Sequence, residues 1–207
     1  MIRYENVGFS PAGQPVLKSF GLEVGRGEKV IIYGKSGTGK SSVLKMLLGF
    51  VRPETGAVFF DGREVDRKTV WEVRRRVAYV SQDLDISDGK AGDFLEWAFS
   101  IKANQACGRS REKMRVTMDW LELGRDLLDK EMADLSGGEK QRLALALAVA
   151  LGRDVFLLDE ATSTVDLEMK ARIVGYFSTL EAATVLAVSH DETWLRADGM
   201  RVVKLGD

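Results

Sequence analysis

The sequence predicts an α/β fold in which short buried strands alternate with amphipathic helices. Three apolar runs carry this prediction: KVIIY at 29–33, VFLLD at 155–159 and ATVLAVS at 183–189. Their β-branched and large residues are typical of strands buried on both faces of a parallel sheet. Residues 166–180 show the spacing of an amphipathic helix that leads into the third run. Strands that alternate with helices in this way indicate a layered α/β domain.

Two other segments have a different character. RPETGAVFFDGREV at 52–65 holds strand material between turn residues, which predicts a hairpin near an N-terminal sheet. Apolar residues recur at helical spacing over 93–130, and these predict a helical insert between strand segments. Large aromatic side chains of such an insert are more often core than contact surface. The aromatic residues expected in this core are Phe94, Trp97, Phe99 and Trp120.

The bulk composition limits the classes of function. The chain has 207 residues, a net charge of −1 and 29% charged residues, so we expect one domain without a basic nucleic-acid surface. A single cysteine, Cys107, excludes an intrachain disulfide and fits a reducing compartment. The N-terminus lacks the pattern of a signal peptide. The longest apolar run, LALALAVALG, is shorter than the roughly 20 residues that cross a bilayer, so we expect any membrane crossing to come from another chain.

A glycine-rich loop follows the first predicted strand. GKSGTGKS at 34–41 fits the pattern G-x-x-x-x-G-K-[ST] and precedes the helical stretch SSVLKMLLG. Glycine at positions Gly34, Gly37 and Gly39 is expected to let the backbone N–H groups point at phosphates. We expect Lys40 to contact the β- and γ-phosphates and Ser41 to bind Mg²⁺. The pattern leaves ATP and GTP open. The residues expected to contact nucleotide are Gly34, Lys35, Ser36, Gly37, Thr38, Gly39, Lys40, Ser41 and Ser42.

Two carboxylates follow the strand predicted at 155–159. Side chains at the carboxyl end of a central parallel strand face the crevice where ligands bind in such sheets. We therefore expect Asp159 to hold Mg²⁺, directly or through water, and Glu160 to accept a proton from the attacking water. Alone, the pair would be an ordinary surface Asp-Glu at a strand end. Beside a phosphate loop, the functional interpretation is favoured.

A second glycine-rich stretch, LSGGEKQR, opens a helical run. Ser136, Gly137 and Gly138 lie at its start, where free N–H groups and the helix dipole favour an anion. The structural alternative is an N-cap serine followed by flexible glycines. A cap alone would not need both glycines, so we expect this backbone to approach a γ-phosphate closely.

Taken in order, these motifs resemble those of the ATP-binding cassette (ABC) ATPases, and the resemblance covers essentially the whole chain. GKSGTGKS resembles the Walker A motif, VFLLDE the Walker B motif, and LSGGE the signature, with Glu139 where glutamine is common. Gln82 in VAYVSQD resembles the Q-loop glutamine that senses Mg²⁺ and the attacking water. Asp166 in STVD resembles the acidic D-loop residue. His190 in AVSHD, the one histidine of the sequence, resembles the switch histidine that contacts the γ-phosphate.

The resemblance implies a P-loop NTPase sheet with a RecA-like core, a small antiparallel β subdomain and an inserted α-helical subdomain. Residues 1–207 would form a single ABC ATPase domain, with 1–82 and 131–207 as the core and β subdomain and about 83–130 as the helical subdomain. Pro11 stands near the place where the family has an aromatic residue on adenine, so we expect weak stacking. The implied catalytic residues are Glu160, His190, Gln82 and Lys40, and the implied Mg²⁺ residues are Ser41, Gln82 and Asp159.

The resemblance also implies partners. Two copies would pair head to tail on ATP, and each would complete the other's site through Ser136, Gly137, Gly138, Glu139 and Asp166. A separately encoded transmembrane permease would dock in a groove between the Q-loop and the helical insert, lined by a minority of the insert's apolar residues. This implies a cytoplasmic protein bound peripherally to the inner face of the membrane. The alternatives are a soluble ABC ATPase in an assembly process such as iron–sulfur cluster biogenesis, and a P-loop kinase or GTPase, which would not explain LSGGE, the D-loop or His190.

Overall fold

The computed structural model describes residues 1–84, 88–105 and 111–206, and its strands form two sheets. Within these residues an antiparallel sheet has the order β2-β1-β4-β5, and a parallel sheet has the order β6-β7-β8-β3-β9. The strands are β1 (Ile2–Phe9), β2 (Leu17–Val24), β3 (Lys29–Tyr33), β4 (Thr55–Phe60), β5 (Arg63–Glu64), β6 (Val77–Val80), β7 (Val155–Asp159), β8 (Thr184–Ser189) and β9 (Arg201–Lys204). The sheets confirm the predicted α/β class and its three predicted strands.

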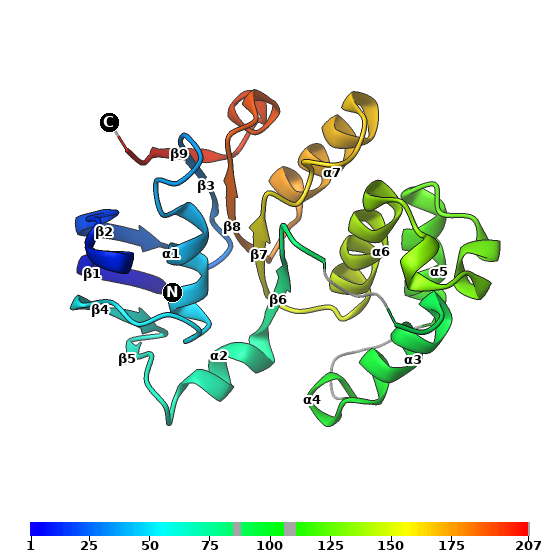
Figure 1. Ribbon diagram of the computed structural model, residues 1–207, viewed down its shortest axis with the longest axis horizontal. Coiled ribbons are helices and arrows are strands. Elements are labelled where there is room, and N and C mark those ends of the chain that lie inside the picture. Colours follow the sequence, from blue (N-terminus) through cyan, green and yellow to red (C-terminus); the bar gives the residue numbers. More distant parts are fainter. Residues whose placement is uncertain (85–87, 106–110, 207) are drawn as a thin grey trace.

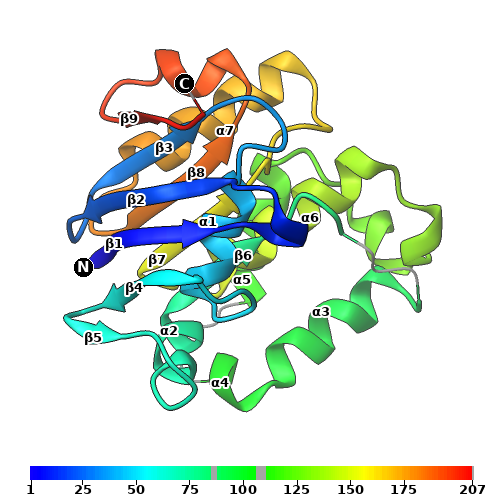
Figure 2. The ribbon, with the colours of Figure 1, turned by 60° about the vertical axis from the view of Figure 1, so that its left-hand side comes forward.

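Helices cover both faces of the parallel sheet (Figure 1). They are α1 (Lys40–Leu47), α2 (Val70–Arg76), α3 (Ala91–Ser100), α4 (Lys102–Gln105), α5 (Arg111–Trp120), α6 (Gly137–Ala150) and α7 (Leu167–Thr179). Short 3-10 helices are η1 (Pro11–Gly13), η2 (Arg125–Asp129), η3 (Met132–Asp134) and η4 (Glu192–Arg196). Figure 1 places α1 between the two sheets and α5 and α6 on the far side of the parallel sheet, and Figure 2 shows the antiparallel sheet in front of α1.

The parallel sheet is buried on both faces because its apolar residues alternate between two cores. Successive side chains of a strand point to opposite faces. On β3, Val30 and Ile32 pack with α1 and the antiparallel sheet, whereas Ile31 packs with α6 and α7. The same alternation runs along β7 and β8, whose residues are all buried. This placement holds the carboxyl ends of β3, β7 and β8 side by side at one edge of the sheet.

The predicted hairpin at 52–65 is present as β4 and β5. Phe60 pairs with Arg63 across a two-residue turn, Asp61–Gly62, whose φ angles are 47° and 80°. Positive φ at both central residues is the geometry that favours Asp-Gly in a tight hairpin. The turn therefore follows from local sequence alone.

The stretch predicted as a helical insert contains α3, α4, α5 and η2. Leu95 of α3 is buried in the same core as Met114 and Met118 of α5. The expectation of a core aromatic is wrong for Trp97, which is 62% exposed, because α3 packs only its Ala91–Leu95–Ala98 face. The other predicted aromatics are partly buried against this core: Phe94, Phe99 and Trp120. Cys107 lies outside the described residues.

No helix in the part of the chain that the structure describes combines the length and the apolar character that spanning a membrane requires.

Candidate functional site

The loop between β3 and α1 has the backbone that its glycines predict, with one exception. Gly37 and Gly39 have φ angles of 82° and 93°, the left-handed region that side chains disfavour. Gly34 does not adopt a positive φ. A Cβ there would collide with the carbonyl oxygen of Leu205, just beyond β9. The need for glycine at this position therefore comes from the close approach of another segment, and the conformational reason expected for Gly34 is wrong.

Lys40 begins α1 and is only 6% exposed. Its ammonium group donates to the carbonyl oxygens of Gly34, at 2.8 Å, and Lys35, at 2.9 Å. The ammonium also lies 3.8 Å from Glu160 Oε1, a buried carboxylate oxygen. A buried cation needs such partners. Lys40 is thus held at the mouth of the loop, where a phosphate oxygen could replace a carbonyl as its partner.

Asp159, at the end of β7, is held by two hydroxyl groups. Ser41 Oγ donates to Oδ1 at 2.7 Å, and Tyr79 Oη donates to Oδ2 at 3.0 Å. Burial raises the pKa of Asp159 in spite of these two hydrogen bonds. Ser41 and Asp159 are 118 residues apart in sequence, yet the fold brings together a hydroxyl and a carboxylate. Mg²⁺ prefers oxygen ligands of this kind. The residues present therefore fit this metal.

Sequence patterns missed Tyr79. It lies on β6, opposite Leu157 of β7. Burial raises its pKa above the usual value, with the Asp159 carboxylate adding to the effect. A tyrosine hydroxyl is in any case protonated at neutral pH and can donate. Its closeness to Asp159 depends on β6 and β7 being neighbours, which no local pattern indicates.

Glu160 directly follows β7 and is 6% exposed. Its Oε1 lies 2.8 Å from His190 Nδ1, and its Oε2 accepts a hydrogen bond of 3.2 Å from Ser189. Its φ is 48°, an uncommon value for a non-glycine residue that costs conformational energy and is often found at functional sites. The structure thus brings the carboxylate of one strand end and the histidine of the next into contact. No sequence pattern singled out Ser189, as was also the case for Tyr79.

One hollow gathers most of the predicted residues of the P-loop side. Its lining includes the loop after β3, the residues that directly follow β7 and β8, and the start of α1, together with Gln82 and Pro11. Pro11, which the resemblance puts near the adenine-stacking position, lies in η1 and lines the same hollow. The residues that line the hollow are Pro11, Val16, Ser36, Gly37, Gly39, Lys40, Ser41, Ser42, Gln82, Glu160 and His190. Asp159 does not line this hollow, but it accepts a hydrogen bond from Ser41, which does.

The LSGGE motif lies away from the P-loop hollow, at the start of α6. Ser136 caps α6 and forms a capping box, since its Oγ accepts from Glu139 N at 3.2 Å and Glu139 Oε2 accepts from Ser136 N at 2.8 Å. The hydrogen bond from Ser136 N lowers the pKa of Glu139. The structural alternative considered for Ser136 is therefore present, whatever else this residue does.

At position 138 the fold itself requires glycine, because of packing. A Cβ at Gly138 would lie 2.9 Å from the backbone oxygen of Thr164, whereas one at Gly137 would meet only the Thr164 side chain, at 3.7 Å. Thr164 Oγ1 in turn donates to Gly137 O at 3.2 Å. The signature thus packs directly on the loop that carries Asp166. Asp166 caps α7 by accepting from Met169 N at 2.9 Å, a hydrogen bond that lowers its pKa.

These signature and D-loop residues line a hollow that shares no residue with the P-loop hollow. The residues are Ser136, Gly137, Gly138, Arg142, Thr164, Val165 and Asp166. Within one chain the two predicted halves of the nucleotide site therefore do not meet.

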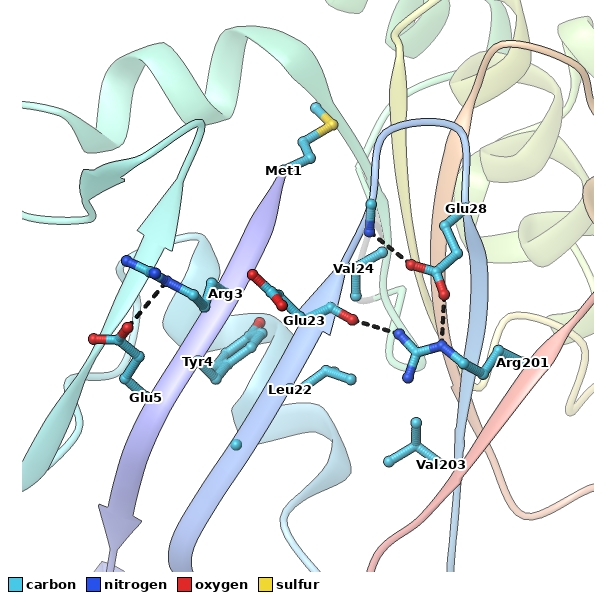
Figure 3. A pocket seen from close by; sticks show the side chains of 12 residues that line it. Met1, Arg3, Tyr4, Glu5, Leu22, Glu23, Val24, Glu28, Arg201 and Val203 are labelled. Carbon is cyan, nitrogen blue, oxygen red and sulfur yellow. Dashed lines mark hydrogen bonds and ion pairs between the residues drawn. The ribbon is translucent and has the colours of Figure 1, made fainter.

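A further hollow of about 860 Å³ lies beside β1, β2 and β9 (Figure 3). Four of its charged side chains form two ion pairs: Arg3 pairs with Glu5 at 3.1 Å, and Arg201 pairs with Glu28 at 2.5 Å. Arg201 also donates to the backbone oxygen of Glu23. This hollow contains none of the predicted nucleotide-binding residues, so its size does not make it the candidate site.

Comparisons with known proteins agree with the motifs. The ABC transporter family model matches residues 17–163. The energy-coupling factor transporter ATP-binding protein EcfA1 of Geobacillus kaustophilus is 38% identical over 192 residues, which covers 88% of this chain and 67% of that protein. The protein of the same name from Enterococcus faecalis is 37% identical, with 86% of this chain and 64% of the relative covered. The chain therefore spans about two thirds of the length of these relatives.

Solved structures give the same result. A dimeric bacterial ABC transporter cassette has a TM-score of 0.82 and 25% identity, with 99% of this chain and 94% of that chain covered. Its post-hydrolysis form bound to ADP and Pi has a TM-score of 0.81. The ATP-bound structure of a bacterial Atm1-family ABC exporter has a TM-score of 0.83 and covers all of this chain but 38% of the other. The fold, the motifs and these matches lead to one conclusion: the chain is an ATP-binding ATPase of the ABC transporter family.

Proposed function

We propose that this chain is the energy-supplying subunit of an ABC transporter, that it binds Mg-ATP with the P-loop hollow, and that it hydrolyses ATP as a head-to-tail homodimer. One observation carries the proposal. The P-loop lysine, the Ser41–Asp159 pair and the Glu160–His190 pair gather at one sheet edge, while the signature faces a separate hollow. A second copy would supply the missing half of the site.

In this proposal each residue has a distinct task. The N–H groups of the loop and of the α1 start hold the phosphates. Ser41, Asp159 and Gln82 hold Mg²⁺, which when bound offsets phosphate charge. Lys40 exchanges a carbonyl partner for a phosphate oxygen. Glu160 accepts a proton from the attacking water, since its hydrogen bonds with Ser189 and His190 fix the carboxylate in place.

The proposed dimer has two-fold symmetry. A symmetric pair presents the same two surfaces from each copy, so one contact that joins a signature to a P-loop necessarily occurs twice. Ser136, Gly137 and Gly138 would then offer the start of α6 to the nucleotide bound by the partner, with Glu139 and Asp166 beside them. The dimeric cassette among the similar structures supports this arrangement.

The Glu160→Gln variant tests the mechanism. It keeps the side chain's size but removes the base, so we expect it to bind Mg-ATP, to hydrolyse it at a rate at least tenfold lower and to elute as a dimer in size-exclusion chromatography. Glu181→Gln, an exposed glutamate beyond α7, is the matched control and should behave as the wild type. A Glu160→Gln protein that stays monomeric with Mg-ATP, or that hydrolyses ATP at the wild-type rate, would refute the proposal.

The permease is proposed to dock on large apolar side chains that are exposed on α2, on α3 and just beyond α1. Phe50 is 61% exposed, Trp71 60% and Trp97 62%. Phe50 lies just beyond α1, Trp71 lies on α2 and Trp97 lies on α3. The Arg74 guanidinium stacks on both Phe50 and Trp71, which holds these two rings close together. Docking there would hold the chain peripherally on the inner face of a membrane and let the helices of about 83–130 transmit motion.

Copurification distinguishes transport from assembly. The relatives are transporter ATP-binding proteins, which supports transport over a soluble ATPase of iron–sulfur cluster biogenesis. Affinity purification from detergent-solubilised native membranes should yield a multi-helix protein, and Trp97→Ser should reduce its recovery without changing nucleotide binding. A soluble scaffold recovered in its place would contradict transport.

A further inference from the structure

Asp159 is held at both carboxylate oxygens, and only one of the two donors belongs to a predicted motif. Ser41, from the P-loop, donates to Oδ1 at 2.7 Å. Tyr79, from β6, donates to Oδ2 at 3.0 Å. Asp159 is 2% exposed, so rotation of its carboxylate would leave a buried polar atom without a partner. The two hydroxyl groups together therefore fix one orientation of this carboxylate.

The position of Tyr79 separates the role of its ring from that of its hydroxyl. Tyr79 stands opposite Leu157 in the parallel pair β6–β7, and its long side chain reaches forward to Asp159, two residues further along β7. The half-buried ring packs against the core that β3, β7 and α1 share. Phenylalanine would preserve that packing. The hydroxyl is the part that acts on the carboxylate.

We propose that Tyr79 is a positioning residue for the Mg²⁺ site: it orients Asp159 so that the edge shared with Ser41 stays turned toward the metal. The proposal rests on the proposed function. Groups that hydrogen-bond a ligating carboxylate orient it, and their loss typically costs about 10–100-fold in metal affinity or activity. Tyr79 also lies three residues before Gln82, so the same hydrogen bond ties the strand that leads to Gln82 to the strand that carries Asp159.

The test compares Tyr79→Phe with Tyr176→Phe. Tyr176 lies on α7, where its ring packs against Trp120 and Phe177, and it lines neither the P-loop hollow nor the signature hollow. Free Mn²⁺, measured by electron paramagnetic resonance in the presence of ADP, reports metal affinity without turnover. We expect Tyr79→Phe to raise the Mn²⁺ dissociation constant about tenfold. ADP affinity measured in EDTA should stay within twofold of the wild type, and Tyr176→Phe should change neither quantity.

ATP hydrolysis supplies a second readout. The Mg²⁺ concentration for half-maximal rate should rise about tenfold in Tyr79→Phe, while the rate at saturating Mg²⁺ falls much less. A Mn²⁺ dissociation constant within twofold of the wild type would overturn the role of Tyr79. So would an equal loss of ADP affinity in EDTA and in Mn²⁺, because that would indicate a packing role only. A wild-type chain that binds neither ADP nor Mn²⁺ would instead refute the proposed function itself.

Discussion

The two adjacent glycines of the signature make different demands on the fold, and substitution of each by alanine separates them. Both belong to the first turn of α6, and neither has a positive φ. At Gly138 an added Cβ would lie 2.9 Å from Thr164 O, a backbone atom that cannot rotate away. At Gly137 the nearest atom would be a methyl carbon of Thr164 at 3.7 Å, an ordinary contact.

The magnitude follows from that difference. Relief of the Gly138 contact to 3.4 Å requires a backbone shift of about 0.5 Å (3.4 − 2.9) in the loop before Asp166. Overpacking of this kind typically costs about 1–3 kcal/mol. Alanine in a helix gains about 0.5–1 kcal/mol over glycine, but this gain applies to both variants and cancels in their comparison. Gly138→Ala should therefore be less stable than Gly137→Ala by about 1–3 kcal/mol.

Urea denaturation followed by tryptophan fluorescence measures this difference, and thermal unfolding checks it. For a domain of this size, about 2–4 °C of Tm corresponds to each kcal/mol, so Gly138→Ala should melt at least about 2 °C below Gly137→Ala. Equal stabilities would refute the packing argument. If Gly137→Ala is stable but loses ATP hydrolysis, the first glycine serves the nucleotide rather than the fold.

Two further predictions concern the segment after β8. Burial would raise the pKa of Asp191, but hydrogen bonds from Lys170 and Thr193 and the Lys170 charge hold it at about 2, below the usual 3.8. A carboxyl group whose pKa is lowered by folding stabilises the fold at pH values above its pKa in the unfolded chain, so Asp191→Asn should be less stable than the wild type at about pH 6. The difference in urea midpoint between the two proteins should shrink as the pH falls from 3.8 toward 2. A difference that does not depend on pH would contradict this. Trp194 Nε1 donates a buried hydrogen bond of 3.1 Å to Thr162 Oγ1. Trp194→Phe should therefore lower the free energy of unfolding, measured in urea, by about 1–3 kcal/mol. An unchanged free energy of unfolding would show that the hydrogen bond makes no net contribution.

Sequence alone predicted the buried strands because strongly apolar runs need no tertiary information. KVIIY and VFLLD match β3 and β7 in full. The sequence does not predict β1 as a separate strand, because apolar and polar residues stop alternating at Asn6, where the structure has a φ of 48° and the register shifts. The order β6-β7-β8-β3-β9 was also beyond local patterns, because neighbours in that sheet come from distant parts of the chain.

In the candidate site, too, local features were predictable from sequence and contacts between distant segments were not. Motif spacing predicted Lys40 and Asp159 as site residues, because each motif is local in sequence. Tyr79 and Ser189 were missed because their roles arise from contacts with Asp159 and Glu160 across strands. The close approach of Leu205 to Gly34 joins residues from opposite ends of the chain and has no local signal.

Capping and nucleotide binding need not compete at Ser136. A hydroxyl has one donor and two acceptor positions. In the capping box Ser136 Oγ accepts from Glu139 N, so its O–H remains available to donate to a phosphate oxygen. Glu139 uses Oε2 for Ser136 N and lies 3.6 Å from Lys130 through Oε1, which keeps its negative charge engaged within the chain. The cap therefore fixes the start of α6 in advance, and the same serine hydroxyl is still free to donate a hydrogen bond to a phosphate oxygen of nucleotide held by a second copy.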